Sequence, residues 1–241
     1  MIYSFRRNSI EETLKDHVKE MLRILEDSTD SKVFKFAEKL SVSKKVFHDS
    51  IKIAVIFHDS GKIFYQKPSG NLSFPGHERA STYILDIFTK KLIRINMLEN
   101  KVRNLMLFSV LYHHHAMGER NYHIESSVKL KHLFEEFTRD VSELMEQYDL
   151  KSYINPLKEV ITLFVEKMGC KPEATQIKEV ENELWDHYVN SEVKTLMLLS
   201  LSILVSLDYE AAKKLRGGAY SPFYPAVKEF TQNYLQNNLK F

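Results

Sequence analysis

Apolar residues recur along most of this chain at the three-to-four-residue spacing of amphipathic helices. The first such segment begins at Ser9, where Glu12 follows three residues later in a capping-box pattern. A central segment ends at His58 and Asp59, and a last helix is expected in the tail. The other expected helices cover residues 33–40, 77–92, 102–112, 127–148, 156–168, 175–189 and 193–215. The periodicity therefore predicts an all-α fold.

Two of these helices carry a polar side chain on their apolar face. His17 lies three residues after Leu14, on the buried stripe of the first helix, where a histidine is a core residue unless other ligands face it. Asp208 continues the apolar face of segment 193–215. An unpaired carboxylate in a core costs several kcal/mol, so we expect either Arg216 or a metal ion as its partner.

Composition limits the class of protein. The 241 residues, 44% hydrophobic and 27% charged, are typical of a globular chain with a full core, and seven Gly and six Pro are too few for a turn-rich β fold. A net charge of +2 does not by itself indicate a nucleic-acid partner. The single cysteine, Cys170, excludes an internal disulfide, and the N-terminal segment has no signal-peptide core, so we expect a cytoplasmic protein. The longest apolar run, 196–207, is too short to span a bilayer and predicts a buried helix.

The stretch Ile53–Lys62 carries the clearest chemistry. His58 and Asp59 offer an imidazole nitrogen and a carboxylate oxygen from adjacent positions, a donor pair that suits divalent transition metals. On a helix Lys62 would share their face and stand beside any anion that the metal holds. The same tetrapeptide, FHDS, also occurs at 47–50, but it follows charged residues there. We therefore expect only the second copy to be buried.

Other histidines differ in what they indicate. His77 follows the loop 66–76 and opens a helix, so it is either a site residue or a surface loop histidine. His113, His114 and His115 are consecutive, and because adjacent helical positions point about 100° apart, packing alone does not explain all three. We expect His113 and His114 to act together, with His115 pointing elsewhere. The histidines not expected to be ligands are His123, His132 and His187.

The ordered set resembles the HD-domain superfamily of metal-dependent phosphohydrolases, and most of all the stand-alone HD nuclease of type I CRISPR interference. The set is His17, His58 and Asp59 with Lys62, His77, His113 and His114, and Asp208. The resemblance implies an HD-domain helical bundle over 1–241, with an additional helical insert over 119–192 and a closing segment over 217–241. The family commonly has a histidine pair followed by Gly, so the pair here is either His113 with His114 or His114 with His115.

The resemblance also implies a two-metal site. One ion would be held by His17, His58, Asp59 and Asp208; Asp59 would bridge to a second ion held by His77, His113 and His114. Lys62 would contact the scissile phosphate and act with Asp59 in catalysis, and Arg216 would contact substrate. Imidazole and carboxylate ligands favour Mn²⁺, Co²⁺, Ni²⁺ or Fe²⁺ over Ca²⁺, with Mg²⁺ also allowed. Two such ions about 4 Å apart can activate water and stabilise the leaving oxygen of a phosphodiester.

The expected function is hydrolysis of DNA, preferably single-stranded, in CRISPR interference, an antiviral defence in the cytoplasm. No Walker-type motif is present in the sequence, so unwinding would need a separate helicase chain beside the interference complex. No membrane partner is expected. One alternative is an HD phosphohydrolase acting on a small nucleotide or a cyclic dinucleotide. Another is a non-catalytic helical interaction module. In the tail, Tyr220, Phe223 and Tyr224 lie near basic residues and would either stack bases or close the core.

Overall fold

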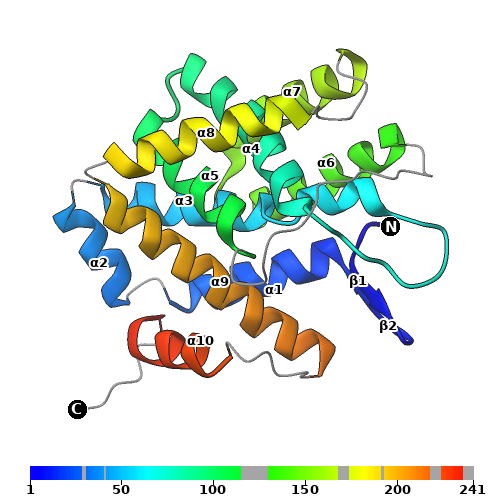
Figure 1. Cartoon of the computed structure of the whole chain (residues 1–241), viewed down its shortest axis with the longest axis horizontal. Coiled ribbons are helices and arrows are strands. Elements are labelled where there is room, and N and C mark those ends of the chain that lie inside the picture. The colour runs from blue at the N-terminus through cyan, green and yellow to red at the C-terminus, as the bar shows by residue number, and fades with distance from the viewer. Residues whose placement is uncertain are drawn as a thin grey trace.

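The chain folds mostly into α-helices, as its periodicity predicts (Figure 1). A computed structural model describes residues 1–28, 31–40, 42–114, 130–167, 174–190, 193–217 and 224–235. The helices are α1 (Leu14–Glu26), α2 (Lys32–Lys39), α3 (Lys44–Phe57), α4 (His77–Arg94), α5 (Asn100–Tyr112), α6 (Leu130–Gln147), α7 (Ile154–Lys167), α8 (Ala174–Asn190), α9 (Lys194–Arg216) and α10 (Tyr224–Phe230). Two short 3₁₀ helices, η1 (Ser60–Tyr65) and η3 (Lys151–Tyr153), and a π-helical turn, η4 (Thr231–Leu235), complete them.

A β-hairpin at the N-terminus was not predicted. Strands β1 (Tyr3–Arg7) and β2 (Ile10–Thr13) pair antiparallel around a two-residue turn in which Asn8 and Ser9 have φ of 50° and 67°. Turns with both residues in this left-handed region match the twist of paired strands. The capping box expected at Ser9 is therefore wrong. The first helix is capped instead by Thr13, whose hydroxyl oxygen accepts the backbone N–H of Asp16 at 3.0 Å.

The core brings the ends of several helices together. α5 packs against α3, α4 and α9, and α1 packs against α3 and α9. Figure 1 shows α9 lying across α1, below α3 and α5 in that view. The C-terminal ends of α3 and α5 and the N-terminal end of α4 consequently lie near the N-terminal part of α1, which carries His17, and the second half of α9, which carries Asp208. This meeting point holds the candidate site.

The three helices expected in the charged region are present as α6, α7 and α8. α6 packs on η1 and α7, and α7 and α8 both pack on α4. The buried Arg103 of α5 binds Asp86 of α4 at 2.5 Å and Glu183 of α8 at 2.9 Å, so one guanidinium ties three helices together. The buried apolar side chains of these helices belong to the same cluster as those of α1 to α5.

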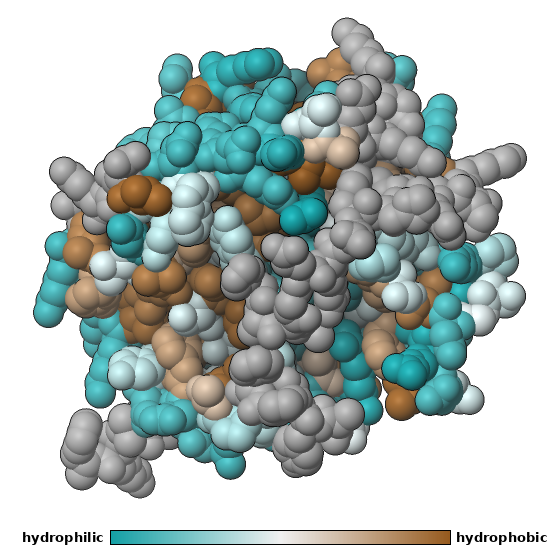
Figure 2. Space-filling model, in the orientation of Figure 1, coloured by the Kyte–Doolittle hydropathy of each residue, from teal (hydrophilic) through white to brown (hydrophobic). Residues whose placement is uncertain are grey.

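The helix α9 contains the apolar run 196–207 and extends beyond it on both sides, close to the expected bounds 193–215. Over its 23 residues it is the one helix among the described residues that is long and apolar enough to cross a membrane by length and composition. Core helices of other proteins pass the same test, and 44% of its most apolar window is buried. Figure 2 shows apolar side chains gathered over its first half, where Leu198 is 45% exposed. Its packing on α1 and α5 favours a core helix.

The described part of the tail closes the core. Tyr224 and Val227 of α10 are buried, and the phenol of Tyr224 accepts a hydrogen bond from Lys213 of α9. Tyr220 and Phe223 lie outside the described residues. Of the two alternatives for the tail aromatics, the contacts of Tyr224 favour closure.

Candidate metal centre

The site forms where helices begin and end. His58 is the C-cap residue of α3, and Asp59 follows it at the start of η1. His113 is the C-cap residue of α5, and His77 is the first residue of α4, directly after Gly76 with φ of 69°. Residues at helix ends leave the regular helix, so neighbouring side chains can converge in a way that positions inside a helix do not allow.

Three histidines share one hydrogen-bonding arrangement. The Nδ1 atoms of His58 and His77 lie 2.7 Å from the carbonyl oxygens of Val55 and Phe74, respectively. The Nδ1 atom of His113 lies 2.6 Å from the Val110 carbonyl oxygen. A carbonyl oxygen only accepts, so each Nδ1 carries a proton, and Nε2 is the nitrogen that would bind a metal ion. Metal-ligating histidines are characteristically oriented in this way.

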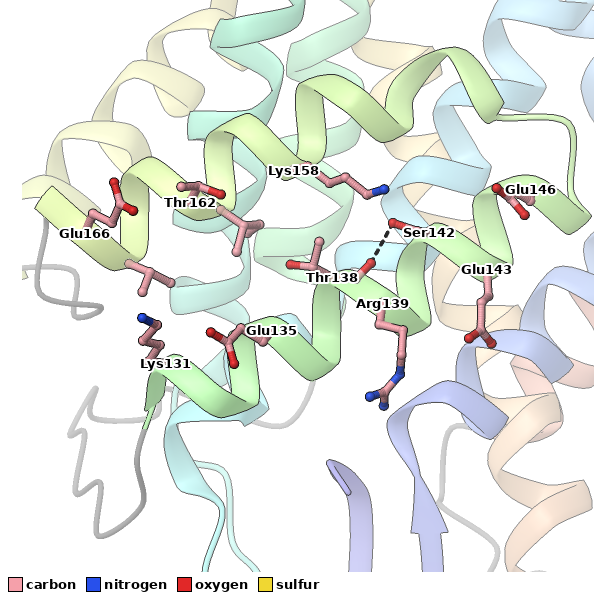
Figure 3. A pocket seen from close by; sticks show the side chains of 12 residues that line it. Lys131, Glu135, Thr138, Arg139, Ser142, Glu143, Glu146, Lys158, Thr162 and Glu166 are labelled. Atoms are coloured by element: carbon pink, nitrogen blue, oxygen red, sulfur yellow. Dashed lines mark hydrogen bonds between the residues drawn. The ribbon is translucent and has the colours of Figure 1, made fainter.

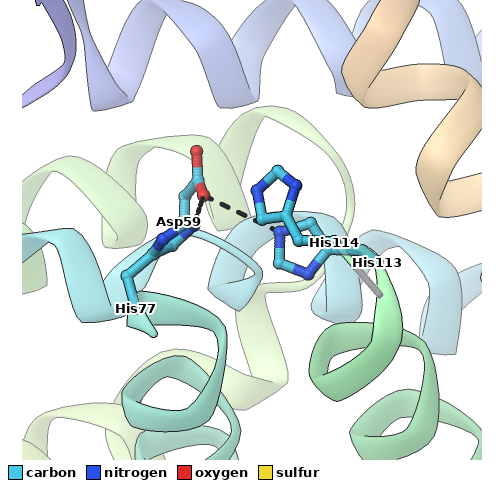
Figure 4. A group of neighbouring side chains, drawn as sticks. All are labelled: Asp59, His77, His113 and His114. Carbon is cyan, nitrogen blue, oxygen red and sulfur yellow. Dashed lines mark hydrogen bonds and ion pairs between the residues drawn. The ribbon is translucent and has the colours of Figure 1, made fainter. Parts of the chain in front are cut away.

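Asp59 lies between these Nε2 atoms and is 1% exposed. Its Oδ1 is 2.8 Å from His77 Nε2 and 3.9 Å from His113 Nε2, as Figure 4 shows. Its Oδ2 is 3.3 Å from His58 Nε2 and 2.6 Å from Lys62 Nζ. Burial alone would raise the pKa of Asp59, but His58 and Lys62 outweigh it and hold that pKa well below its usual range. The two oxygens of one ionised carboxylate thus face different histidines.

The ligand atoms fall into two overlapping groups that could each hold a metal ion. One group contains Asp59, His77, His113 and His114, and the other contains His17, His58 and Asp59. Within each group one ligand atom per residue lies within 4.8 Å of the others, and Asp59 belongs to both. Imidazole and carboxylate donors in this ratio suit divalent transition metals.

Unpaired nitrogens in this cluster fit a metal ion. His58 Nε2, His113 Nε2 and His114 Nδ1 are buried and form no hydrogen bond with any residue that the structure describes. Burial, followed by the neighbouring His58, lowers the pKa of His113 to about 3, and burial with the neighbouring His113 lowers that of His114 as well. Both imidazoles are therefore neutral at physiological pH. A buried neutral nitrogen without a partner is the form that a metal ion binds.

His17 joins the cluster from α1 between two carboxylates. It is fully buried; its Nε2 lies 3.0 Å from Asp208 Oδ1, and its Nδ1 lies 2.7 Å from Glu12 Oε1. Burial would lower the pKa of His17, but the hydrogen bonds to Asp208 and Glu12 raise it to about 9. Burial likewise opposes ionisation of Asp208, yet its bond to His17 keeps the pKa of this carboxyl well below its usual range.

Arg216 was one of two expected partners for Asp208, and this expectation is wrong. Its guanidinium instead binds the carboxylate of Glu12, with Nε at 2.7 Å and Nη2 at 3.0 Å. The residue that hydrogen-bonds Asp208 is His17. Asp208 therefore contacts the cluster through His17. Arg216 binds Glu12, which in turn contacts His17.

The structure brings most of the expected residues together. His17, His58, Asp59, His77, His113 and His114 form the two groups, and Asp208 adjoins His17. Lys62 lies in a 3₁₀ helix rather than an α-helix, and its Nζ donates to Asp59 Oδ2 and to the Ser4 carbonyl oxygen. His132 and His187 lie on exposed surface away from the cluster, as expected. His115 and His123 lie outside the described residues.

The first copy of the repeated tetrapeptide is more buried than expected. His48 is 7% exposed, and its ring packs edge-on against Phe34 at 5.0 Å. Asp49 forms a salt bridge with Lys45 at 2.8 Å. Among the described residues, neither belongs to a group that could hold a metal ion. The flanking charges misled the prediction because α3 is enclosed by α2 on that side.

Glu12 is the site residue that sequence reasoning assigned only to a helix cap. Glu11 and Glu12 look alike in the sequence, and which of them faces inward depends on the hairpin register. The available signal was the Asn8-Ser9 pair, a two-residue turn between short strands. Recognising it would have placed Glu12 on the opposite face from Glu11.

A groove between α6 and α7 lies apart from the cluster (Figure 3). It has a volume of about 650 Å³, and all its lining residues come from these two helices. Lys131, Arg139 and Lys158 are balanced there by four glutamates, which disfavours a phosphate site.

No protein-family model and no curated protein matches this chain. The fold and the site together define a mostly helical protein with a buried His/Asp cluster that could hold metal ions.

Proposed function

We propose that this chain is a metal-dependent HD-type nuclease that hydrolyses phosphodiester bonds of DNA, preferably single-stranded. The observation that carries the proposal is the placement of Asp59. Its two oxygens face imidazoles of two different groups, and three imidazoles of the cluster bind a backbone carbonyl oxygen at Nδ1 and direct Nε2 into the cluster. This is the arrangement of a carboxylate that bridges two ions.

The chain's own residues divide into two ligand sets around Asp59. His17 and His58, with Asp208 adjoining, would hold one divalent ion, and His77, His113 and His114 would hold the other. When bound, the two ions would activate a water and neutralise the charge on the leaving oxygen. Lys62 contacts the oxygen of Asp59 that also faces His58, so its ammonium stands where it could meet a substrate phosphate.

The proposed partners rest on the resemblance to the HD nuclease of type I CRISPR interference. They are single-stranded DNA, a separate helicase chain and the complex of type I CRISPR interference, acting in the cytoplasm.

A circular single strand tests the proposal most directly, because it has no ends for an exonuclease. We expect the purified chain to cut this DNA with Mn²⁺ and to lose that activity in excess chelator. A chain that binds metal but leaves circular and linear DNA intact would contradict the nuclease.

The burial of the cluster favours one second candidate. Among the ligands of the two groups only His114 is partly exposed, and a deep site suits a small phosphoester. An HD phosphohydrolase would release phosphate or nucleoside from mononucleotides, or linearise cyclic dinucleotides, and leave circular DNA intact. A non-catalytic helical module would show no metal-dependent turnover on any of these substrates.

A further inference from the structure

His17 differs from His58, His77 and His113 in the group that lies against its Nδ1 atom. The Nδ1 atoms of His58, His77 and His113 meet backbone carbonyls of their own segments. The Nδ1 atom of His17 lies 2.7 Å from a side-chain carboxylate, that of Glu12 on β2. A carboxylate makes a bound imidazole a stronger electron donor than a neutral carbonyl does.

Glu12 is itself held firmly. It is 5% exposed, and its Oε1 accepts from the Ser4 hydroxyl at 2.6 Å. Arg216 at the end of α9 donates to both of its oxygens, at 2.7 and 3.0 Å. The carboxylate is therefore fixed from β1 and α9 while it faces α1.

We propose that Glu12 is a positioning residue for a metal ion at His17, an inference that rests on the metal centre proposed above. The contact of its carboxylate with Nδ1 holds the His17 ring so that Nε2 faces Asp208, with the His58 ring 5.4 Å away. Among the described residues, the hydrogen bonds and ion pairs of the Glu12 carboxylate go to Ser4, Arg216 and His17, and none goes to Asp59 or the His77 group. Its effect is confined to one of the two ions.

This arrangement also makes the two sites unequal. The His17 side has Asp208 adjoining it and Glu12 behind it, whereas the other side has three imidazoles and shares only Asp59. Added negative charge strengthens the binding of a divalent cation.

The test isolates each ion in turn by calorimetric titration of the full chain with Mn²⁺. In a His77→Ala chain only the His17 side remains, and adding Glu12→Gln should weaken its binding about 10–100-fold. In a His17→Ala chain only the other side remains, and Glu12→Gln should change its affinity by less than about twofold. Glu11→Gln, an exposed neighbour on the same strand, should change neither affinity.

Each outcome decides the inference. Equal binding with and without Glu12→Gln in the His77→Ala chain would overturn it. Weakening on both sides would also overturn it, because a general structural role would then explain the loss. Arg216→Met, which leaves the carboxylate against His17, should weaken the His17 side less than Glu12→Gln does. No Mn²⁺ binding by the unaltered chain would remove the metal centre itself, a result distinct from failure at Glu12 alone.

Discussion

At the scale of single residues, Asp59 is the one ligand that both metal groups require. Asp59→Asn keeps the shape of the side chain but removes its charge, so we expect cleavage to be lost while the helical content stays near that of the unaltered chain. Metal-dependent cleavage and circular dichroism together measure this. Asp49→Asn is the matched control, since Asp49 follows a histidine in the other copy of the tetrapeptide and forms a salt bridge with the exposed Lys45. Retention of more than a few per cent of activity by Asp59→Asn would argue against the assignment.

A second prediction at this scale concerns protons. Without metal, burial lowers the pKa of His17, but the bonds to Asp208 and Glu12 raise it to about 9, so the imidazole is protonated at neutral pH. Metal ligation needs the neutral form of His17. At neutral pH the carboxyls of Asp59 and Asp208 are already ionised and the imidazole of His113 is already neutral, as metal binding requires. Binding on the His17 side should therefore release about one proton below pH 9 and strengthen about tenfold per pH unit from pH 6 to 8.

Calorimetry in buffers of different ionisation enthalpy counts the released protons. The His77 side, measured in a His17→Ala chain, serves as the comparison, because His113 and His114 have lowered pKa values and are already neutral. Affinity on the His17 side that does not change between pH 6 and 8 would show that His17 is not a ligand in its neutral form.

At the scale of elements, the contact between η1 and α4 sets the distance from Asp59 to His77. A Cβ added at Gly61 would lie 2.1 Å from the His77 carbonyl oxygen and 2.8 Å from the Ser81 backbone nitrogen. Gly61→Ala must push η1 away from α4, so we expect a loss of about 1–3 kcal/mol in the free energy of unfolding and weaker metal binding. Gly70→Ala also strains the backbone, with φ of +84°, but meets no atom within 4 Å and should leave metal binding unchanged. Equal metal affinities in the two variants would refute this role for Gly61.

Helices were easier to predict than strands, because long helices repeat an apolar stripe in the sequence and short strands do not. Long helices such as α1 and α9 repeat an apolar stripe and were identified from it, although the true start of α1 was masked by a false capping box at Ser9. The hairpin was missed because strands of five and four residues carry too little alternation to compete with that signal. Burial of His48 was missed because charges beside it in sequence lie on another face of α3.

At the scale of the whole molecule, the cluster draws on residues as far apart as His17 and Asp208. Residue types and order predicted the ligand set, but only the packing of α1 and α9 against the ends of α3 and α5 shows which side chains meet. The resemblance placed Asp208 and His17 at one ion, but the direct hydrogen bond between them could not be predicted from spacing. Arg216 was close in sequence, whereas His17, 191 positions away, is close in space.

Metal binding should also stabilise the entire chain, because the ligands converge only when it is folded. A metal at 100 times its dissociation constant adds about 2.7 kcal/mol for each site. For a chain of this length that corresponds to about 5–10 °C in the midpoint of thermal unfolding for each site. Differential scanning fluorimetry with Mn²⁺ and with chelator measures the shift, and Asp59→Asn should abolish most of it. An unchanged midpoint in the unaltered chain would count against a metal held inside the fold.

The central claim is that the cluster binds two divalent ions bridged by Asp59. The number of Mn²⁺ ions bound per chain at saturation tests this claim most directly. Calorimetric titration should show two binding events in the unaltered chain and one each in His17→Ala and His77→Ala, with the surviving event weakened because Asp59 belongs to both groups. A single Mn²⁺ per unaltered chain, lost in His17→Ala and retained in His77→Ala, would contradict the two-metal account.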